Sequence, residues 1–343
     1  MEKTVIVTGV AGFVGTNFSQ HLLHRGFNVL GIDVGDVSSR LKTSGVLEHA
    51  NMTFMQVNLA DNRPHVEGHE AIAAIYHFAA LPHVDYSYFH PRQAIENNIK
   101  SLLTSIELAI ALRVPLILSS SVECYGGSVD KVYDEADSPA PLSTYAASKV
   151  ASEAIVKTYI ETQGLQATML RFTNLYGPWQ APDRLVPRII AQALYDKDAV
   201  VEKGTNRDFI FIKDACALLE EVMTFDHTGA LYNLSSGTRT DNFEAVQLIA
   251  EQLPELRLTV REPRHNDGRG KYLIPSPKKL YATTNWRPTT TLQEGIVATI
   301  DWYRTHQTWL DQFLPAIEAE RTTDAFLTDA SYWAKHDTAP RLG

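Results

Sequence analysis

The clearest candidates for chemistry in this sequence are a tyrosine and a lysine four residues apart, Tyr145 and Lys149. Spacing of four places two side chains on one face of a helix. A phenol normally loses its proton near pH ~10, and a nearby ammonium stabilises the phenolate and lowers that pKa. A phenolate can take the proton of a hydroxyl group while hydride leaves the same carbon. The pair therefore predicts oxidation of an alcohol.

Two residues after a predicted strand could share this site. Ser121 ends a run of three serines at the carboxyl end of the strand, where parallel sheets bind ligands, and it could hydrogen-bond the reacting hydroxyl. Glu123 lies two residues later, on the same side of an extended chain, and could act as a base. The alternatives are an ordinary turn for the serine, and an ion pair with Lys149 or a histidine for the glutamate.

The segment 8–15 reads Thr-Gly-Val-Ala-Gly-Phe-Val-Gly and lies between a predicted strand and a predicted helix. Gly9 would permit the tight turn, Gly12 would let a pyrophosphate approach the backbone, and Gly15 would permit close helix–strand packing. The pyrophosphate would face free N–H groups at the helix N-terminus. The motif predicts a dinucleotide site, with a purely structural glycine turn as the alternative.

Asp33 ends the next predicted strand at the distance from the glycines that is usual for such sites. Its carboxylate would accept hydrogen bonds from a ribose 2′-hydroxyl and repel a 2′-phosphate, so it favours NAD over NADP. The alternative is a polar residue that only caps its strand.

The elements that must position these residues alternate between strand and helix. Continuous apolar runs predict buried parallel strands, and apolar residues at helical spacing predict helices between them. The predicted strands are Thr4–Val7, Asn28–Ile32, Thr53–Val57, Ile75–Phe78 and Leu116–Leu118, and the predicted helices are Thr16–Arg25 and Arg92–Leu112. The expected fold is an α/β Rossmann doubly wound parallel sheet with a smaller C-terminal α/β substrate lobe.

The 343 residues allow more than one lobe. We expect an NAD-binding domain over 1–175, to which later segments return, a substrate lobe over mainly 176–303, and a C-terminal extension over 304–343. In that extension, Trp309, Leu310, Phe313 and Leu314 suggest a docked helix. Its function is not readable.

Composition excludes several functions. The net charge of -9 argues against nucleic acid as a partner. Two cysteines, Cys124 and Cys216, suggest neither a disulfide framework nor a metal site. No leader or apolar run long enough for a membrane span is apparent, so a cytoplasmic protein that does not enter the membrane is expected.

Several ordered motifs resemble the extended short-chain dehydrogenase/reductase family, whose members modify nucleotide sugars, and the resemblance extends to about Tyr303. The motifs are the glycine segment, His77-Phe78-Ala79-Ala80, Asn98, Ser119–Gly126, Tyr145–Lys149, Arg171–Pro178, Arg207-Asp208-Phe209 and Trp286-Arg287-Pro288. The resemblance implies NAD as cofactor, a nucleotide-diphosphate sugar as substrate, and Ser121, Tyr145 and Lys149 as the catalytic set.

The resemblance also implies binding residues. Asn174 and Arg207 would meet the diphosphate, and either Arg264 or Arg269 would supply a second arginine. Other residues implied at the cofactor are Phe13, Val14, Asn58, Leu59, Phe78, Ala79, Ala80 and Asn98, and others at the substrate are His83, Arg184 and Leu185. Asn58 departs from the family, which usually has an aspartate near the adenine; its amide oxygen is still an acceptor.

Family members begin by oxidising carbon 4 of the hexose. The ketone acidifies the proton on carbon 5, and epimerisation, loss of water across carbons 5 and 6, or decarboxylation can follow. Glu123 favours a 4,6-dehydratase, since several dehydratases and decarboxylases have glutamate there. Val122 departs from the deoxythymidine-diphosphate-glucose dehydratases, which have an aspartate that is thought to protonate the departing water. Cys124 and His83 are candidate replacements, although a cysteine beside a strand is more often core filling and a loop histidine is more often a packed residue.

The leading hypothesis is thus a 4,6-dehydratase with Glu123 as base, followed by a 4-epimerase or a uronic acid decarboxylase. A non-catalytic NAD-binding regulator would be expected to lose Tyr145 or Lys149, and a simple reductase would not need Asn174 and Arg207. The resemblance suggests a homodimer formed through helices at 92–112 and 145–164.

Overall fold

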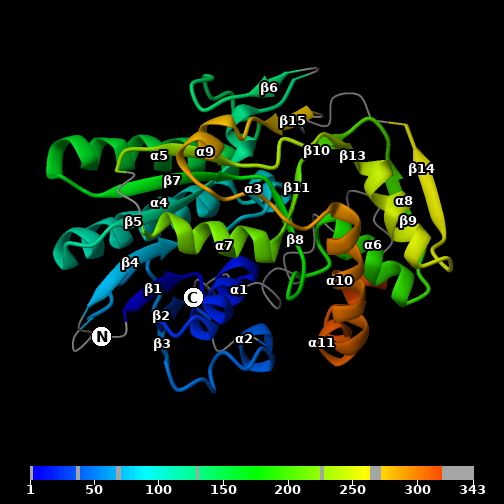
Figure 1. Cartoon of the computed structure of the whole chain (residues 1–343), viewed down its shortest axis with the longest axis horizontal. Coiled ribbons are helices and arrows are strands. Elements are labelled where there is room, and N and C mark those ends of the chain that lie inside the picture. The colour runs from blue at the N-terminus through cyan, green and yellow to red at the C-terminus, as the bar shows by residue number, and fades with distance from the viewer. Residues whose placement is uncertain are drawn as a thin grey trace.

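The computed structural model describes residues 3–35, 39–66, 71–128, 131–224, 228–262 and 272–318. Its centre is a seven-stranded parallel sheet in the order β12-β7-β5-β4-β1-β2-β3 (Figure 1). These strands are β1 Thr4–Thr8, β2 Asn28–Asp33, β3 Met52–Gln56, β4 Ile72–His77, β5 Leu116–Ser121, β7 Ala167–Phe172 and β12 Leu231–Leu234. The expected doubly wound α/β fold is confirmed.

The strands form because their apolar residues are buried on both faces of the sheet. Val5, Ile6 and Val7 of β1 are fully buried and pack into clusters on opposite faces. One face is covered by helices α1 (Phe13–His24) and α7 (Ile212–Val222), and the other by α4 (Pro91–Leu112) and α5 (Thr144–Gln163) (Figure 1). Helices on both faces explain the continuous apolar runs in the sequence.

The chain reverses its direction of travel across the sheet between β1 and β4. After β1 it adds β2 and β3 on one side, and it then crosses to add β4, β5, β7 and β12 on the other side. Ligands of such sheets bind at the carboxyl ends of the strands beside this switch point. The segments that follow β1 and β4 therefore lie where a dinucleotide would be expected.

The smaller lobe is built from short strands and three main helices. A second core lies between α6, α8 and α10 and contains Ile189, Val246 and Ile300. The remaining strands are β6 Val132–Tyr133, β8 Asn174–Tyr176, β9 Ala199–Glu202, β10 Asn206–Arg207, β11 Phe209–Phe211, β13 Thr240–Asp241, β14 Leu258–Arg261 and β15 Tyr272–Pro275. The remaining helices are α2 Ser39–Thr43, α3 Val84–Phe89, the 3-10 turn η1 Val122–Tyr125, α6 Leu185–Leu194, α8 Asn242–Gln252, α9 Lys278–Thr283, α10 Leu292–Thr305, α11 Gln307–Asp311 and α12 Leu314–Glu318.

The two lobes are joined by continuous elements. β12 returns to the main sheet and pairs with β7. The boundaries expected after residues 175 and 303 fall inside β8 and α10. Beyond α10, Trp309, Leu310 and Phe313 are buried, so the described part of the extension docks as two short helices against α2 and α6.

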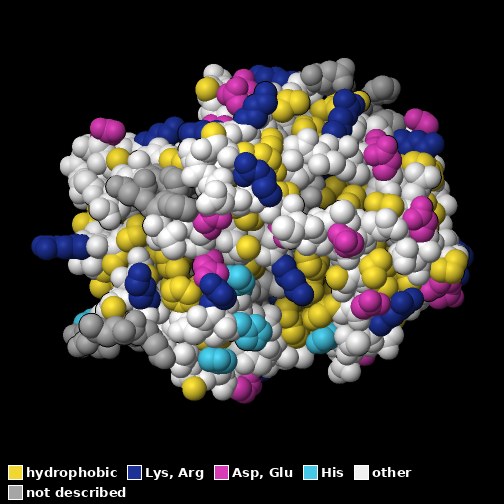
Figure 2. Space-filling model, in the orientation of Figure 1, with side chains coloured by type: hydrophobic (Ala, Val, Ile, Leu, Met, Phe, Trp, Pro, Cys, Tyr) yellow, Lys and Arg dark blue, Asp and Glu magenta, His cyan; other side chains and the backbone are white. Residues whose placement is uncertain are grey.

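Acidic and basic side chains are interspersed on the face seen in Figure 2, without a large patch of one sign. Among the described residues, no helix is long and apolar enough to cross a membrane, and no group of three or more His, Cys, Asp or Glu could hold a metal ion. Cys124 and Cys216 are both buried free thiols.

Candidate active site

A cavity of about 560 Å³ lies at the carboxyl ends of the central strands, between the two lobes. That volume is typical of a site for a cofactor or small ligand. Its walls combine the glycine segment after β1, the ends of β2, β4 and β5, the start of α5, and residues of α6 and β10. The cavity therefore collects residues that are far apart in the sequence.

The glycine segment is shaped by contacts that a side chain would prevent. Gly9 has a φ of 68°, and a Cβ there would lie 2.7 Å from the Ala79 nitrogen. A Cβ on Gly15 would lie 2.2 Å from the Gly9 carbonyl oxygen. Gly12 precedes α1 and has no side chain to cap the first-turn N–H groups of the helix. These features leave a helix N-terminus open to the cavity that Gly9, Gly12, Phe13, Val14 and Gly15 line.

Asp33 is buried at the end of β2 and holds this segment in place. One carboxylate oxygen accepts a hydrogen bond from the Ala11 N–H at 2.9 Å, and the other accepts from the Val34 N–H at 2.8 Å. Asp33 also lines the cavity. The residue thus has a structural role in addition to the expected cofactor contact.

Other expected cofactor residues divide into two groups. Asn58, Leu59, Phe78, Ala79 and Ala80 line the cavity. Asn98 does not line it and is 98% buried behind the wall.

The Asn98 side chain accepts from the Leu81 N–H at 2.7 Å and donates to Ser148 Oγ at 3.0 Å. It joins the segment after β4 to α5. In the described structure, Asn98 positions the wall rather than forming it.

Ser121, Tyr145 and Lys149 meet at one end of the cavity. Tyr145 opens α5, whose N-terminus is capped by Ser143, and the Ser121 hydroxyl is a hydrogen-bond partner of its phenol. Lys149 donates to the Ser119 carbonyl oxygen at 2.8 Å, and its Nζ lies 5.9 Å from the centre of the Tyr145 ring. The helical spacing therefore brings both side chains to the end of β5.

Burial controls the protonation of this pair. It raises the pKa of Tyr145 to about 12, against a smaller lowering effect of the Ser121 hydrogen bond, and it lowers the pKa of Lys149 to about 8. We expected Lys149 to lower the Tyr145 pKa; that expectation is wrong for this structure, because desolvation of the phenolate dominates. The ammonium is directed to the Ser119 carbonyl instead.

Glu123 reaches the cavity by a different local structure from the one expected. The chain does not stay extended after Ser121: residues 122–125 form the turn η1, and the Ser121 hydroxyl caps it by accepting from the Glu123 N–H at 3.2 Å. Glu123 nevertheless lines the cavity, and its charge acts on Tyr145. Among the described residues, no hydrogen bond or ion pair holds its carboxylate, in contrast to the ion pair considered as an alternative.

The neighbours of Glu123 in η1 are apolar or inaccessible. Val122 is 3% exposed and packs with Tyr125, Tyr133 and Leu273. Cys124 is fully buried outside the cavity, and burial raises the pKa of its thiol to about 11. Cys124 therefore fits poorly as a proton donor to a bound ligand.

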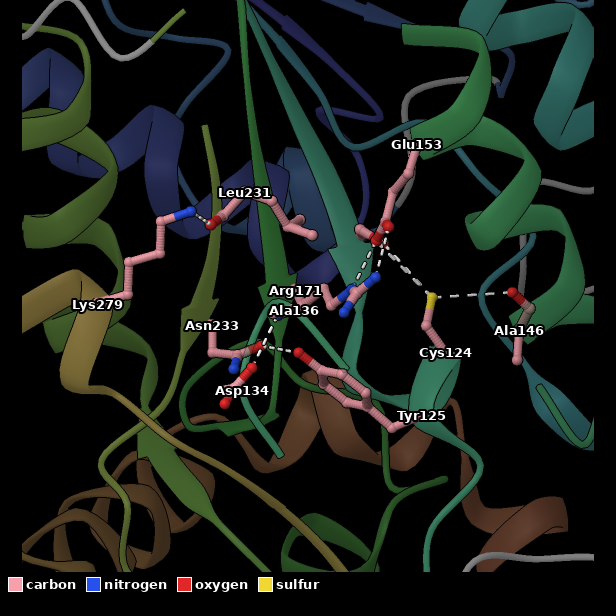
Figure 3. A network of polar contacts seen from close by, with 11 residues as sticks. Cys124, Tyr125, Asp134, Ala136, Ala146, Glu153, Arg171, Leu231, Asn233 and Lys279 are labelled. Atoms are coloured by element: carbon pink, nitrogen blue, oxygen red, sulfur yellow. Dashed lines mark hydrogen bonds and ion pairs between the residues drawn. The ribbon is translucent and has the colours of Figure 1, made fainter. Parts of the chain in front are cut away.

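A buried ion pair lies beneath this turn (Figure 3). Glu153 of α5 accepts two hydrogen bonds from Arg171 of β7, at 2.8 and 2.7 Å, and a third from Ser120 at 2.6 Å. The Arg171 guanidinium also lies 4.5 Å from the centre of the Tyr125 ring. The pair connects the helix that carries Tyr145 to the turn that carries Glu123.

Five expected substrate residues line the cavity from two sides: His83 lies between β4 and α3, and the other four lie between β8 and β10. Asn174, Arg207, Arg184, Leu185 and His83 all line it. Asn174 donates to the Asp208 carbonyl oxygen, and Arg207 to the Asn206 carbonyl oxygen. Arg264 and Arg269 lie outside the described residues.

Arg40, Phe313 and Asp183 are among the cavity-lining residues that the sequence did not assign to the site. Arg40 of α2 donates to the carbonyl oxygens of Ala11 and Trp179, both at 2.7 Å, and so joins the glycine segment to the loop before α6. Phe313 reaches the wall from beyond α10, and Asp183 contacts His83. Each acts through long-range contacts that local sequence spacing does not reveal.

The chain is similar to known enzymes that act on nucleotide sugars. The family model described as GDP-mannose 4,6 dehydratase matches residues 6–299. A dTDP-glucose 4,6-dehydratase of Xanthomonas campestris pv. campestris is 31% identical, with 91% of this chain and 96% of that protein aligned.

The fold is also similar to solved structures of a dehydratase and of an epimerase. DesIV, a dTDP-glucose 4,6-dehydratase from Streptomyces venezuelae solved with NAD bound, gives a TM-score of 0.83 at 25% identity and covers 90% of this chain and 99% of its own. The UDP-glucose 4-epimerase of Thermus thermophilus, in complex with NAD, gives 0.76 at 26% identity and covers 88% and 99%.

Proposed function

Because the chain belongs to the GDP-mannose 4,6 dehydratase family, within the extended short-chain dehydrogenase/reductases, we propose that it is an NAD-dependent nucleotide-sugar 4,6-dehydratase. The observation that carries the proposal is the Glu123 carboxylate, which lines the cavity beside Tyr145 and has no hydrogen-bond or ion-pair partner among the described residues. A carboxylate in that state is suited to accept a proton from a ligand.

The cavity suits NAD at its glycine end. Gly9 and Gly15 leave no room for a Cβ, the N-terminus of α1 faces the cavity, and Asp33 provides the carboxylate that a ribose diol needs. Bound NAD would take a hydride from sugar carbon 4 and later return one to the sugar. Asp33 also predicts a preference for NAD over NADP; equal affinity of the protein for both would contradict this assignment.

The nucleotide diphosphate would bind in the smaller lobe. Arg207 and Asn174 line that end of the cavity, and a guanidinium matches the geometry of phosphate oxygens. The test is the melting temperature with UDP, dTDP or GDP, since a ligand that binds the native state raises it. A simple reductase of small carbonyl compounds would show no such rise.

The first chemical step belongs to Tyr145. Its phenolate, hydrogen-bonded to Ser121, would accept the proton of the sugar hydroxyl at carbon 4 and become the phenol. Because burial raises the Tyr145 pKa to about 12, the phenolate is a strong base once formed. Arg184 is a cation whose charge favours the phenolate, while Lys149, 5.9 Å from the centre of the ring, donates to the Ser119 carbonyl oxygen.

The second step belongs to Glu123, which would remove the acidified proton from carbon 5. A Glu123→Gln variant keeps the size and polarity of the side chain but cannot act as this base. It should still reduce NAD on mixing with substrate, and it should lose formation of the dehydrated product, followed by mass spectrometry over a panel of nucleotide sugars. Full turnover by this variant would exclude Glu123 as the base.

A second candidate, 4-epimerisation, is favoured by Val122. This buried apolar residue occupies the position at which related dehydratases would place a proton donor, and epimerisation does not need one. The same mass measurement separates the reactions: loss of one water supports dehydration, unchanged mass with a new isomer supports epimerisation, and loss of carbon dioxide from a uronic acid supports decarboxylation.

The proposed enzyme is a homodimer formed through α4 and α5. Exposed apolar side chains at this side of the molecule support that proposal: Tyr88 and Phe89 of α3 and Ile95 of α4 are each more than 40% exposed. Analytical ultracentrifugation tests it, and an Ile95→Glu variant that is monomeric where the parent is dimeric would locate the interface.

A further inference from the structure

Loss of water from a sugar is assisted by an acid at the departing hydroxyl, and apart from Glu123, which is assigned to the proton of carbon 5, η1 offers none to the cavity. Val122 has no proton to donate. Cys124 is closed off from the cavity and hydrogen-bonds toward Glu153 and the Ala146 carbonyl. A donor separate from Glu123 and from the Tyr145–Ser121 pair would therefore come from another wall of the cavity.

A histidine–carboxylate pair lies on that other wall. His83 Nδ1 is 3.2 Å from Asp183 Oδ2, and the two side chains are only 14% and 9% exposed. Both residues line the cavity, although 100 positions separate them in the sequence. Such a contact holds the ring in a fixed orientation at the cavity wall, and a histidine oriented by a carboxylate is a group that can exchange a proton with a ligand.

The position of His83 is tied to Tyr145 through helix α3. His83 is the residue before α3, and its carbonyl accepts from the Ser87 N–H. The Ser87 hydroxyl in turn accepts from the Tyr145 N–H at 3.1 Å. The segment that carries His83 is thus hydrogen-bonded to the start of α5, where the first proton transfer is proposed.

Arg184 places the pair at the same end of the cavity. It donates to the Pro82 carbonyl at 3.0 Å, its Nη2 lies 3.5 Å from His83 Nδ1, and its charge acts on Tyr145. Asp183 Oδ2 lies closer to His83 Nδ1 than Arg184 Nη2 does, 3.2 Å against 3.5 Å, and it is less exposed, 9% against 44%. The ring thus contacts both a carboxylate and a guanidinium of the cavity wall.

We propose that His83, oriented by Asp183, is the general acid of the dehydration. This rests on the proposed function. After Glu123 takes the proton from carbon 5, the electron pair of that C–H bond forms the double bond between carbons 5 and 6. The C–O bond at carbon 6 breaks as protonated His83 delivers a ring proton to the leaving oxygen, and water departs. Neutral His83 regains a proton from solvent before the next turnover.

The test separates three events in a His83→Asn variant: NAD reduction on mixing with substrate, incorporation of solvent deuterium at carbon 5, and release of water. Oxidation and deuterium incorporation should stay within a few-fold of the parent protein. Formation of the dehydrated product should fall by about 10²–10⁴, the usual contribution of a general acid. Glu123→Gln, by contrast, should lose both deuterium incorporation and water loss.

Asp183→Asn provides a second variant that keeps the histidine, and it should reduce water loss by about tenfold or more while leaving deuterium incorporation intact. It carries the test if His83→Asn does not fold. His24→Asn, an exposed histidine at the end of α1 outside the cavity, is the matched control and should match the parent protein.

Two results would overturn the assignment: undiminished water loss in His83→Asn, or loss of NAD reduction along with water loss, which would make His83 a positioning residue for the sugar. Failure of the proposed function has a different signature, because the parent protein itself would then form an epimer or release carbon dioxide without any loss of water.

Discussion

Two carboxylate–cation clusters flank the catalytic end of the cavity, and they differ in burial rather than in chemistry. Glu153 and Arg171 are 4% and 2% exposed, and both oxygens of the carboxylate are occupied by hydrogen bonds. Asp183, His83 and Arg184 form a looser cluster that borders the cavity. The first cluster holds its geometry, whereas the second borders the cavity, where we propose that it exchanges a proton with a ligand.

The largest expected effect comes from breaking the buried cluster. Arg171→Met would leave Glu153 charged and unpaired inside the protein, so the free energy of unfolding should fall by about 3–5 kcal/mol in urea denaturation. The double variant Arg171→Met/Glu153→Met removes both charges and should be more stable than the single variant. A double variant that is less stable than the single one would contradict this account of the pair.

Tyr145→Phe should affect activity and leave the fold almost unchanged. The ring still fills its site, and only the phenol that meets Ser121 is lost. Rapid-mixing absorbance should show NAD reduction slower by about 10²–10⁴, with unfolding changed by no more than about 1 kcal/mol, the usual value of one hydrogen bond. Normal NAD reduction would exclude Tyr145 as the oxidising base.

Lys149 allows a prediction for pH. Burial lowers its pKa from 10.5 to about 8, so between these values the unfolded chain holds a proton that the native protein has lost. Unfolding then takes up a proton, and stability should rise with pH across this range, by at most about 1.4 kcal/mol per pH unit.

Subtraction of the same curve for Lys149→Met isolates this contribution. Measurements should stop near pH 10, because Tyr145, whose pKa is raised to about 12, acts in the opposite direction above its ordinary value of 10.0. Identical pH curves for the two proteins would show that Lys149 keeps an ordinary pKa in the native state.

The smallest effect is expected at an exposed pair. Arg257 contacts Asp196 at 2.5 Å and Asp198 at 2.6 Å, distances as short as those of the buried cluster, but all three side chains are more than half exposed. Solvent screens such pairs. Arg257→Gln should therefore leave the unfolding midpoint and the activity unchanged. A destabilisation comparable to that of Arg171→Met would mean that distance, not burial, decides the strength of these contacts.

Much of the fold could be predicted from local pattern. The five N-terminal strands and the helices that became α1 and α4 are confirmed, since continuous burial and helical spacing are visible in the sequence. The turn η1 was missed because its chain direction depends on the Ser121 cap and on packing of Val122 against Tyr125 and Leu273. Sequence spacing could not reveal the packing of these residues.

For the cavity too, only residues that belong to short sequence motifs could be predicted. Gly9, Ser121 and Tyr145 were each predicted from a motif whose own residues lie within a few positions of one another. The contact between His83 and Asp183, and the bonds of Arg40 to Ala11 and Trp179, join segments that only the folded chain brings together. Residues of this kind require knowledge of the tertiary structure.

The wall formed by Phe313 has a consequence for the order in which the protein matures. The glycine segment is synthesised before Phe313, which follows some three hundred residues later. A growing chain can complete its seven-stranded sheet once β12 has emerged from the ribosome, but its cavity still lacks one wall. The cavity can therefore close only after α10, α11 and Phe313 are available to dock.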